Sequence, residues 1–487
     1  PTTMDLLTRI IDHIQRMRVL LLITFRPDFK PVWVEYSHVT FLTLSRLPRR
    51  QSAELLASMT GGRALPPEVQ QAILAKTDGV PLYLEELTEN LLESGLLTEG
   101  TSTFRLKEPL KELSIPDSLQ ALLMERIDRL GAAKEIVQIG SAIGREFSYE
   151  LLQEAGDATE SELKNALHLL IASGLIFQEG EISNAKFFFK HALIQDAAYN
   201  TLPKKSRRVL HTRIAKTLES KFVDRVKTEP ELLAHHFEQA GLVERAVAYW
   251  HLAAQRDVAR SANIEALSHF DRALYMLKDL PGGAERDHLE LDLLIARGAP
   301  LQSLKGYASD DIEHNYSRAR TLSQENPSSE QYFLSLWGVW VFHLVRGPLA
   351  KACDLAAGLL SWATHQGNPD LLIRAHESVG STYLFLGRFQ EAKTHLLSAK
   401  SLYDPERHHA QVLPYTQDPG ITARIMLARV FWLLGELDQV EVLVAEAMAM
   451  ARELEHPFTM AFTLATASWI YSTLRDVQRT LLLTEEA

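Results

Sequence analysis

A spaced pattern of small and aromatic residues, which recurs three times in the second half of the chain, most constrains what this sequence can fold into. Each copy places its residues at offsets of 0, 3, 7, 12, 16 and 19. The first three positions fall on one face of a helix that ends at a glycine, and the last three fall on one face of the next helix. The pattern therefore predicts a repeated helical hairpin whose small residues let the two backbones approach closely. The three copies are Ala234, Phe237, Gly241, Ala246, Trp250 and Ala253, then Gly380, Tyr383, Gly387, Ala392, Leu396 and Ala399, then Ala428, Phe431, Gly435, Val440, Val444 and Ala447.

The spacing between copies indicates the type of repeat. The second and third copies start 48 residues apart, against about 34 residues for a minimal tetratricopeptide unit. An inserted loop at residues 408–419 accounts for the excess. Helices of the same kind are predicted over residues 263–277, 310–322 and 351–364. We therefore expect a tetratricopeptide-like solenoid over residues 223–487.

Charge and cysteine content exclude several classes of function. The 487 residues carry 51 Lys and Arg against 62 Asp and Glu, a net charge of −11, which argues against a general nucleic-acid binder. The single cysteine, Cys353, excludes an internal disulfide and a zinc site built from several thiolates. A cytoplasmic protein in a reducing compartment fits this usage.

Two long stretches without charged residues, 331–345 and 456–474, raise the question of membrane spans. The first is shorter than the ~20 residues that a spanning helix needs, and the second is diluted by Thr and Ser. Both are predicted to be buried helices of the solenoid. We expect no membrane partner.

The first 48 residues are predicted to be the C-terminal remnant of an α/β domain. Residues 5–16 show the periodicity of an amphipathic helix, residues 19–24 read as a strand buried on both faces, and residues 38–44 as a second strand. The chain opens with Pro-Thr-Thr, without an initiator Met or a signal peptide. We expect it to be the C-terminal part of a longer protein whose preceding residues supply the rest of the sheet.

The middle of the chain is predicted to be helical, with one short hairpin. Three helices over residues 51–59, 66–76 and 82–94 form a helical lid, assigned to residues 49–115. Helices over 118–130, 134–143, 149–154 and 160–172 precede a hairpin at 175–178 and 186–189, the order of a winged helix, assigned to residues 116–222. The predicted fold class is therefore mainly α: an incomplete α/β remnant, a helical lid, a winged helix and a tetratricopeptide-like solenoid.

No catalytic motif is present in the sequence. A phosphate-binding loop needs a glycine-rich stretch that ends in Gly-Lys-Ser/Thr, and magnesium needs an apolar strand that ends in acidic residues. Neither occurs, nor do the common motifs for zinc, thiol or serine chemistry. Whether the whole protein is an enzyme stays open.

The remaining motifs resemble those of the STAND class of nucleotide switches. In particular, the chain looks like the ATPase–tetratricopeptide part of bacterial proteins that often carry a class III adenylate or guanylate cyclase domain. The resemblance covers essentially the whole chain, and in that family Pro-Thr-Thr directly follows the Walker B segment. It implies that the parent protein binds ATP or ADP, whereas this chain alone does not bind it tightly. It also implies that Arg26, at the end of the first strand, senses the γ-phosphate. The structural alternative is a surface cation that ends a strand.

The resemblance assigns nucleotide contacts to two further sites. Gly79 and Pro81 match the Gly-x-Pro segment that opens a helix against the adenine, although Pro at the first turn of a helix has a purely structural explanation. His191 matches the winged-helix histidine that holds the β-phosphate of ADP in the inactive state. Many members have Asp after that histidine, where this chain has Ala192. The structural alternative for His191 is a helix cap or a packed surface residue.

The predicted function is a regulatory one. Partner binding on the solenoid would be relayed to a nucleotide switch that controls a linked cyclase, and the partner would be a protein or a peptide. The alternative is a transcriptional regulator whose DNA-binding domain lies outside this chain. The predicted recognition helix at 160–172 has Lys164 as its one cation, so we expect a packing domain that binds no nucleic acid. Oligomeric state is left open.

Overall fold

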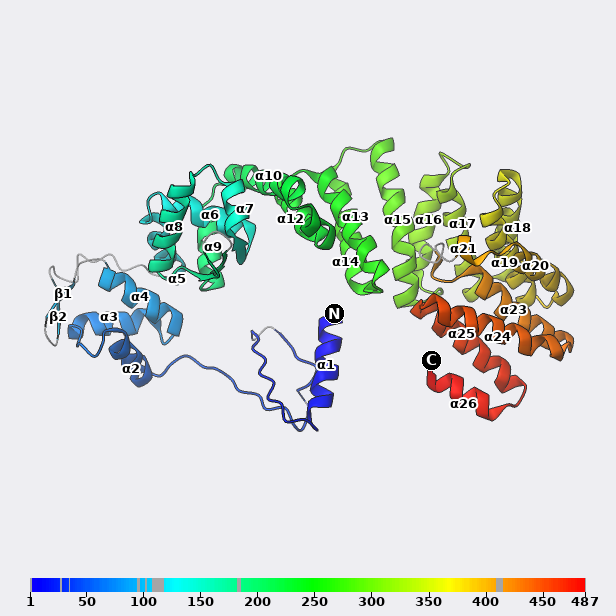
Figure 1. Ribbon diagram of the computed structural model, residues 1–487, viewed down its shortest axis with the longest axis horizontal. Helices are drawn as coiled ribbons and strands as arrows, with labels where there is room; N and C mark the ends of the chain where they lie inside the picture. Colours follow the sequence, from blue (N-terminus) through cyan, green and yellow to red (C-terminus); the bar gives the residue numbers. More distant parts are fainter. Residues whose placement is uncertain are drawn as a thin grey trace. The chain divides into compact units, whose positions relative to one another are not determined.

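The computed structural model describes residues 2–26, 29–34, 36–93, 97–100, 103–106, 118–181, 185–408 and 415–486. Most of them are helical (Figure 1). The chain divides into two compact units. The N-terminal unit comprises Thr8–Thr228 and His235–Leu242, and the solenoid unit comprises Pro1–Leu7, Glu229–Ala234 and Val243–Ala487. The expected mainly α fold is thus confirmed.

The first helix is present, but the two strands predicted after it are not. α1 (Thr2–Ile14) covers the amphipathic stretch, whereas residues 19–24 and 38–44 are irregular. Their apolar side chains face solvent, with Leu20 83% and Leu44 93% exposed. A strand is stable only when a neighbour satisfies its backbone groups, and no described residue pairs with either segment. The prediction of α/β strands in this remnant was therefore wrong for the chain as described.

The three helices predicted for the lid are confirmed within two residues at each end. They are α2 (Arg49–Met59), α3 (Pro67–Thr77) and α4 (Pro81–Glu93), followed by an antiparallel pair of short strands, β1 (Leu97–Glu99) and β2 (Phe104–Leu106). One apolar core joins them, with Leu56, Ile73 and Leu84 at its centre. The predicted boundary between residues 115 and 116 lies outside the described residues.

The next region, residues 118–222, contains the predicted helices and hairpin and one additional strand. The elements are α5 (Leu119–Asp128), α6 (Ala133–Ile143), β3 (Glu146–Ser148), α7 (Tyr149–Ala155), α8 (Glu160–Ala172), β4 (Ile176–Glu179), β5 (Lys186–Phe189), α9 (Ala192–Asn200) and α10 (Lys204–Lys221). The sheet has the order β3-β5-β4 and is antiparallel throughout. Phe147 of β3 stacks on Phe187 of β5 with ring centroids 5.7 Å apart, which explains why so short a strand is held. We call this part the helix–sheet region.

From α13 (Val243–Ala259) onward, each long helix of the solenoid unit packs against the next long helix along the chain (Figure 1). The described elements that follow the helix–sheet region are all helical. They are α11 (Val223–Thr228), α12 (Pro230–Ala240), α13 (Val243–Ala259), α14 (Asn263–Met276), the 3-10 helix η3 (Leu277–Asp279), α15 (Ala284–Lys305), α16 (Asp310–Ser323), α17 (Glu330–Arg346), α18 (Leu349–Gln366), α19 (Pro369–Phe385), α20 (Phe389–Leu402), α21 (Pro405–His408), α23 (Pro419–Leu434), α24 (Leu437–Leu454), α25 (Pro457–Thr473) and α26 (Val477–Glu486). No helix within the described ranges is both long and apolar enough to cross a membrane.

The repeat read from the sequence corresponds to one recurring turn. In each copy the glycine at offset 7 has a left-handed backbone, and the next N–H donates to the carbonyl of the aromatic residue at offset 3. This bond closes the end of the first helix, as in a Schellman motif. The bonds are Leu242 N to Phe237 O at 3.0 Å, Arg388 N to Tyr383 O at 2.9 Å and Glu436 N to Phe431 O at 2.9 Å.

Among the described residues of the solenoid unit, two more copies of this turn lie outside the pattern read from the sequence. Ser261 (φ 57°) and Arg475 (φ 61°) occupy the glycine position. The same bond forms in both, from Ala262 N to Asp257 O and from Asp476 N to Tyr471 O, each at 2.9 Å. The repeat pattern requires glycine at offset 7, so hairpins that place another residue in the left-handed position do not match it.

Candidate functional site

Arg26, the predicted γ-phosphate sensor, lies in an exposed irregular segment. Its carbonyl oxygen accepts a turn hydrogen bond from Phe29 N at 3.0 Å. The sheet edge that was expected to hold the guanidinium is not formed by the described residues. The role of Arg26 therefore stays a prediction.

Gly79 and Pro81 form the turn that opens α4. Asp78 and Gly79 are both left-handed, with φ of 46° and 71°, and Leu47 N donates to the Gly79 carbonyl at 2.8 Å. A Cβ at Gly79 would collide with the backbone of Leu47. Glycine is thus required for conformation and for space, and Pro81 starts the helix with a fixed φ. Packing alone accounts for this motif.

A hollow of about 350 Å³ lies beside this turn, between α2 and α3. Its lining includes Arg46, Arg49, Gln71 and Gly79. Arg46 forms an exposed ion pair with Asp78. Asp78 also lines the hollow and offsets the charge of Arg46. Arg49 is therefore the cation at this turn that is compatible with an anionic ligand, because guanidinium groups bind phosphate oxygens well.

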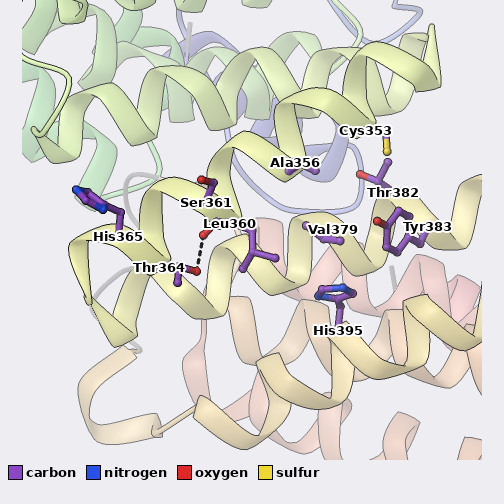
Figure 2. Close-up of a pocket in the computed structure, with 11 residues that line it drawn as sticks. Cys353, Ala356, Leu360, Ser361, Thr364, His365, Val379, Thr382, Tyr383 and His395 are labelled. Carbon is purple, nitrogen blue, oxygen red and sulfur yellow. Dashed lines mark hydrogen bonds between the residues drawn. The ribbon is translucent and has the colours of Figure 1, made fainter.

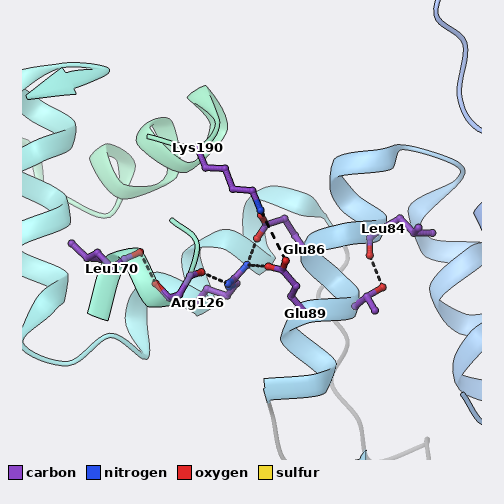
Figure 3. Close-up of polar contacts among 8 residues, drawn as sticks. Leu84, Glu86, Glu89, Arg126, Leu170 and Lys190 are labelled. Carbon is purple, nitrogen blue, oxygen red and sulfur yellow. Dashed lines mark hydrogen bonds and ion pairs between the residues drawn. The ribbon is translucent and has the colours of Figure 1, made fainter. Parts of the chain in front are cut away.

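A buried ionic network joins α4 to the helix–sheet region (Figure 3). Glu86 and Arg126 are 1% and 5% exposed and form an ion pair. Arg126 Nη1 also lies 3.3 Å from Glu89 Oε2, and its Nη2 donates to the carbonyl of Ser173 at 2.8 Å. Lys190 Nζ lies 4.0 Å from the other oxygen of Glu89. One guanidinium thus connects the lid helix with the end of α8 and, through Glu89, with the end of β5.

His191 directly follows this network and is half-buried at the start of α9. Its side chain does not cap the helix, and its Nε2 is buried without a hydrogen-bond partner among the described residues. Burial lowers the pKa of His191; the charges of Lys190 and Arg145 lower it further, while Glu85 of α4 opposes them. A neutral imidazole with one ring nitrogen unused therefore lies within electrostatic reach of Glu85, Lys190 and Arg145.

The solenoid unit has a hollow of about 530 Å³ between α18, α19 and α20 (Figure 2). Cys353 and His365 of α18, Tyr383 of α19 and His395 of α20 lie along it. Burial lowers the pKa of His395, and none of the described residues that line the space is a Lys or an Arg. Because phosphate needs cations or many N–H donors, this hollow suits a neutral ligand better than a nucleotide.

A second cluster in the solenoid unit surrounds Arg374 of α19, which is 1% exposed. Its guanidinium lies 4.3 Å from the ring centroid of Tyr415 and donates to the carbonyl of Gln417. Glu377, one helical turn further along α19, is also buried, and Ser381 donates to it at 2.9 Å. Burial raises the pKa of Glu377 and lowers that of Arg374, while the attraction between the two charges opposes both shifts.

Arg126, Glu86, Arg374 and Glu377 belong to none of the motifs in the sequence. A signal was present, since Arg126 stands on the same helix face as Leu122 and Leu123, and Arg374 beside Leu371 and Ala375. A charge on an apolar stripe implies a buried partner. Among the described residues, no group of three or more His, Cys, Asp or Glu is arranged to hold a metal ion.

No protein-family model matches this chain. A curated relative, an uncharacterized protein of Rhizobium meliloti (strain 1021), is 26% identical over 472 residues, which cover 96% of this chain and 45% of the relative. The chain thus spans less than half the length of that relative.

Two solved structures are similar at 14% identity. One is a STAND protein with a tetratricopeptide repeat sensor from Pyrococcus horikoshii, with a TM-score of 0.39 over 92% of this chain and 66% of that one. The other is NprR in complex with its cognate peptide NprX, with a TM-score of 0.40 over 58% of this chain and 78% of that one.

Proposed function

We propose that this chain is the regulatory part of a larger STAND-type switch. The solenoid would bind a protein or peptide partner, and the junction between α4 and the helix–sheet region, taken as a winged-helix packing domain, would respond to ADP or ATP held by the parent protein. The observation that carries the proposal is the buried, unpartnered Nε2 of His191 beside Lys190 and Arg145.

This arrangement has the chemistry of a phosphate contact. A neutral imidazole can donate one N–H to a phosphate oxygen, and the cations next to it lower the cost of bringing an anion there. His191 also precedes α9, whose first N–H groups carry partial positive charge. Because Lys190 shares Glu89 with Arg126, a phosphate that attracts Lys190 would weaken its hold on α4. The nucleotide state would then change how the lid is held.

Nucleotide binding to the parent protein tests the proposal. His191→Ala should weaken ADP binding at least tenfold and leave ATP affinity nearly unchanged, whereas Arg26→Ala should do the reverse, since ADP lacks a γ-phosphate. His168→Ala, an exposed histidine on α8, serves as the matched control. Equal effects of each substitution on both nucleotides would overturn the assignment. The 487-residue chain alone should show no steady ATP hydrolysis, because the phosphate loop and the magnesium-binding acid are absent from its sequence.

We propose a class III nucleotide cyclase as the effector under control, as the family resemblance implies. The relative from Rhizobium meliloti extends well beyond the matched region, which leaves room for such a domain there. Cyclic nucleotide formation by the parent protein, measured with and without His191→Ala, tests this step. If His191→Ala abolishes nucleotide selectivity but leaves the rate of cyclic nucleotide formation unchanged, the cyclase proposal is refuted and the proposal of a nucleotide switch still stands.

Two further proposals concern the location of the protein in the cell and its lack of nucleic-acid binding. A cytoplasmic location is supported by the lone Cys353. The absence of nucleic-acid binding is supported by α8, where Lys164 Nζ is paired with Glu160 at 2.6 Å and Glu162 completes the capping box at Thr159.

A further inference from the structure

Residues 415–418, which end the inserted loop, lie buried against the solenoid unit. All four are at most 7% exposed although they precede the helical part of α23. Their contacts come from four different hairpins: Gln302 in α15, Trp337 in α17, Arg374 in α19 and Thr459 in α25. α15, α17 and α19 are every second helix of this part of the solenoid unit. The segment therefore touches helices from several repeats, as an extended peptide on a solenoid can.

The contacts are those that a bound peptide would make. The Tyr415 ring meets Trp337 edge-on at 5.0 Å and lies under the Arg374 guanidinium. Thr416 Oγ1 lies 2.7 Å from the hydroxyl of Tyr307, and the Thr416 carbonyl accepts from Thr459 at 3.3 Å. Arg374 donates to the main-chain carbonyl of Gln417. One aromatic ring and two backbone carbonyls are thus recognised.

The fit leaves several polar atoms unsatisfied. Trp337 Nε1, Arg374 Nε and the Tyr415 hydroxyl are buried without a hydrogen-bond partner among the described residues. Each unpaired buried polar atom costs stability that another occupant could recover. A hollow of about 310 Å³ also opens beside Thr416, lined by Ser303 and by His456 to Phe458, so the segment can be approached from that side.

The two ends of the insertion are anchored independently of this contact. His408 Nε2 lies 3.1 Å from Asp370 Oδ1. At the other end Asp418 caps α23 by accepting from Ile421 N at 2.9 Å. Residues 415–417 can therefore leave their contacts without undoing α21 or α23.

We propose that the surface formed by Gln302, Tyr307, Trp337, Arg374 and Thr459, the Arg374 site, binds the peptide partner, and that residues 415–417 are a built-in competitor which the partner displaces. This inference rests on the proposed function in so far as the solenoid has a peptide partner. The partner's chemistry follows from the contacts: an extended segment with an aromatic side chain, and a main-chain carbonyl two residues later that faces the buried arginine. Residues 415–417 set a minimum affinity for the partner, because a peptide must displace them to occupy the Arg374 site.

Peptide binding to the full chain tests the inference. The probe is a fluorescent heptapeptide with the sequence of residues 413–419, with a second peptide in which its tyrosine is alanine. The Tyr415→Ala substitution removes the internal aromatic ring from the Arg374 site. The variant chain should therefore bind the probe at least tenfold more tightly than the wild-type chain does. Arg374→Lys in the Tyr415→Ala background should lose most of that gain, because lysine lacks the planar group that stacks and donates in two directions. The alanine peptide should bind neither protein.

Arg388→Lys in the same background is the matched control. Arg388 also covers a tyrosine ring, Tyr383, at 4.1 Å, but it is exposed and outside the site. Its substitution should leave the affinity for the probe unchanged. If Arg388→Lys reduces binding as much as Arg374→Lys, the probe does not occupy the Arg374 site and the inference is overturned.

Thr416→Ala is a second, milder variant that keeps the test valid if Tyr415→Ala does not fold. It removes only the hydroxyl contact to Tyr307 and should give a smaller gain in probe affinity. Circular dichroism must show unchanged helix content in the variants that are compared. If neither substitution tightens binding in a folded chain, residues 415–417 do not compete and the inference fails. The proposed function is judged separately by the ADP and ATP measurements on His191, which do not involve this site.

Discussion

Replacing Gly380 by alanine tests how closely α19 and α20 pack. A Cβ built at Gly380 lies 2.6 Å from Leu396 Cγ, 2.9 Å from Leu396 Cδ2 and 3.2 Å from the Leu396 backbone nitrogen. Carbon pairs are most favourable at about 3.5–4.0 Å, so the new methyl group is about 1 Å too close to a side chain and also presses on the backbone of α20. Rotation of Leu396 relieves only part of this, because its backbone must move as well.

The expected cost follows from two opposing terms. Overpacking of this kind costs about 1–3 kcal/mol, and the higher helix propensity of alanine returns about 0.5–1 kcal/mol. The net loss lies between about 0 and 2.5 kcal/mol, with a central value of about 1 kcal/mol. Gly358→Ala in α18 is the matched control, because a Cβ there meets Leu336 Cδ2 at an ordinary 3.7 Å. That substitution should instead stabilise the chain by about 0.5–1 kcal/mol.

Hydrogen exchange on the full chain is the appropriate assay, because a chain with two units need not unfold in one step. Gly380→Ala should speed exchange in α19 and α20 and leave α5 to α10 unchanged, since repeats mainly stabilise their neighbours. Gly380→Leu should act in the same place and more strongly. If Gly380→Ala slows exchange as Gly358→Ala does, α19 and α20 do not pack closely at Gly380. An exchange rate that rises evenly from residue 6 to residue 474 would contradict a modular solenoid.

Three other predictions follow from buried groups and caps. Arg126→Met leaves the buried Glu86 carboxyl without its ion pair and should destabilise the N-terminal unit by about 3–5 kcal/mol, measured by thermal unfolding. Adding Glu86→Leu should restore part of the lost stability, whereas a cost below about 1 kcal/mol for Arg126→Met alone would show that the ion pair is not desolvated. Burial, together with the charges of His235 and Arg207, lowers the pKa of His211 to about 4, while the unfolded chain has a histidine pKa of about 6.5. The unfolded state therefore takes up the proton first, so stability is lost as the pH falls from about 6.5 towards 4; His211→Gln should show a flatter pH profile in thermal melts, and parallel profiles would contradict the shift. Thr159→Ala removes the capping box of α8 and should cost about 1 kcal/mol, seen as faster exchange in the first turn of that helix and not in α6.

The helical parts of the fold were predictable from sequence because each helix carries its own 3.6-residue periodicity. The bounds predicted for α8 and β5 match the structure. Residues 19–24 failed because a buried strand is defined by neighbours, and an apolar run does not contain them. Ser261 and Arg475 were missed for a related reason: the left-handed turn is imposed by the packing of two helices, and residues other than glycine can be forced into it at a cost.

The candidate site was predictable only in part. Gly79 and Pro81 were found as a motif, and the structure supplies a packing reason for them that needs no nucleotide. His191 was found by resemblance, but its unpartnered Nε2 is a fact of the fold. Arg374 matches no motif, and a charge on an apolar stripe indicates only that it has a buried partner. That the partner is the Gln417 carbonyl, 43 residues away in the sequence, comes from the fold.

The contact between Thr416 and the end of α15 also governs the order in which the solenoid can be completed during synthesis. Thr416 meets Tyr307 and Gln302 across 109 and 114 residues of sequence. At about 5–20 residues per second, the ribosome needs roughly 5–20 s to make the intervening chain. For that time the surface beside Gln302 lacks the segment that covers it in the folded chain, so the end of α15 stays open to chaperones and to association with other chains.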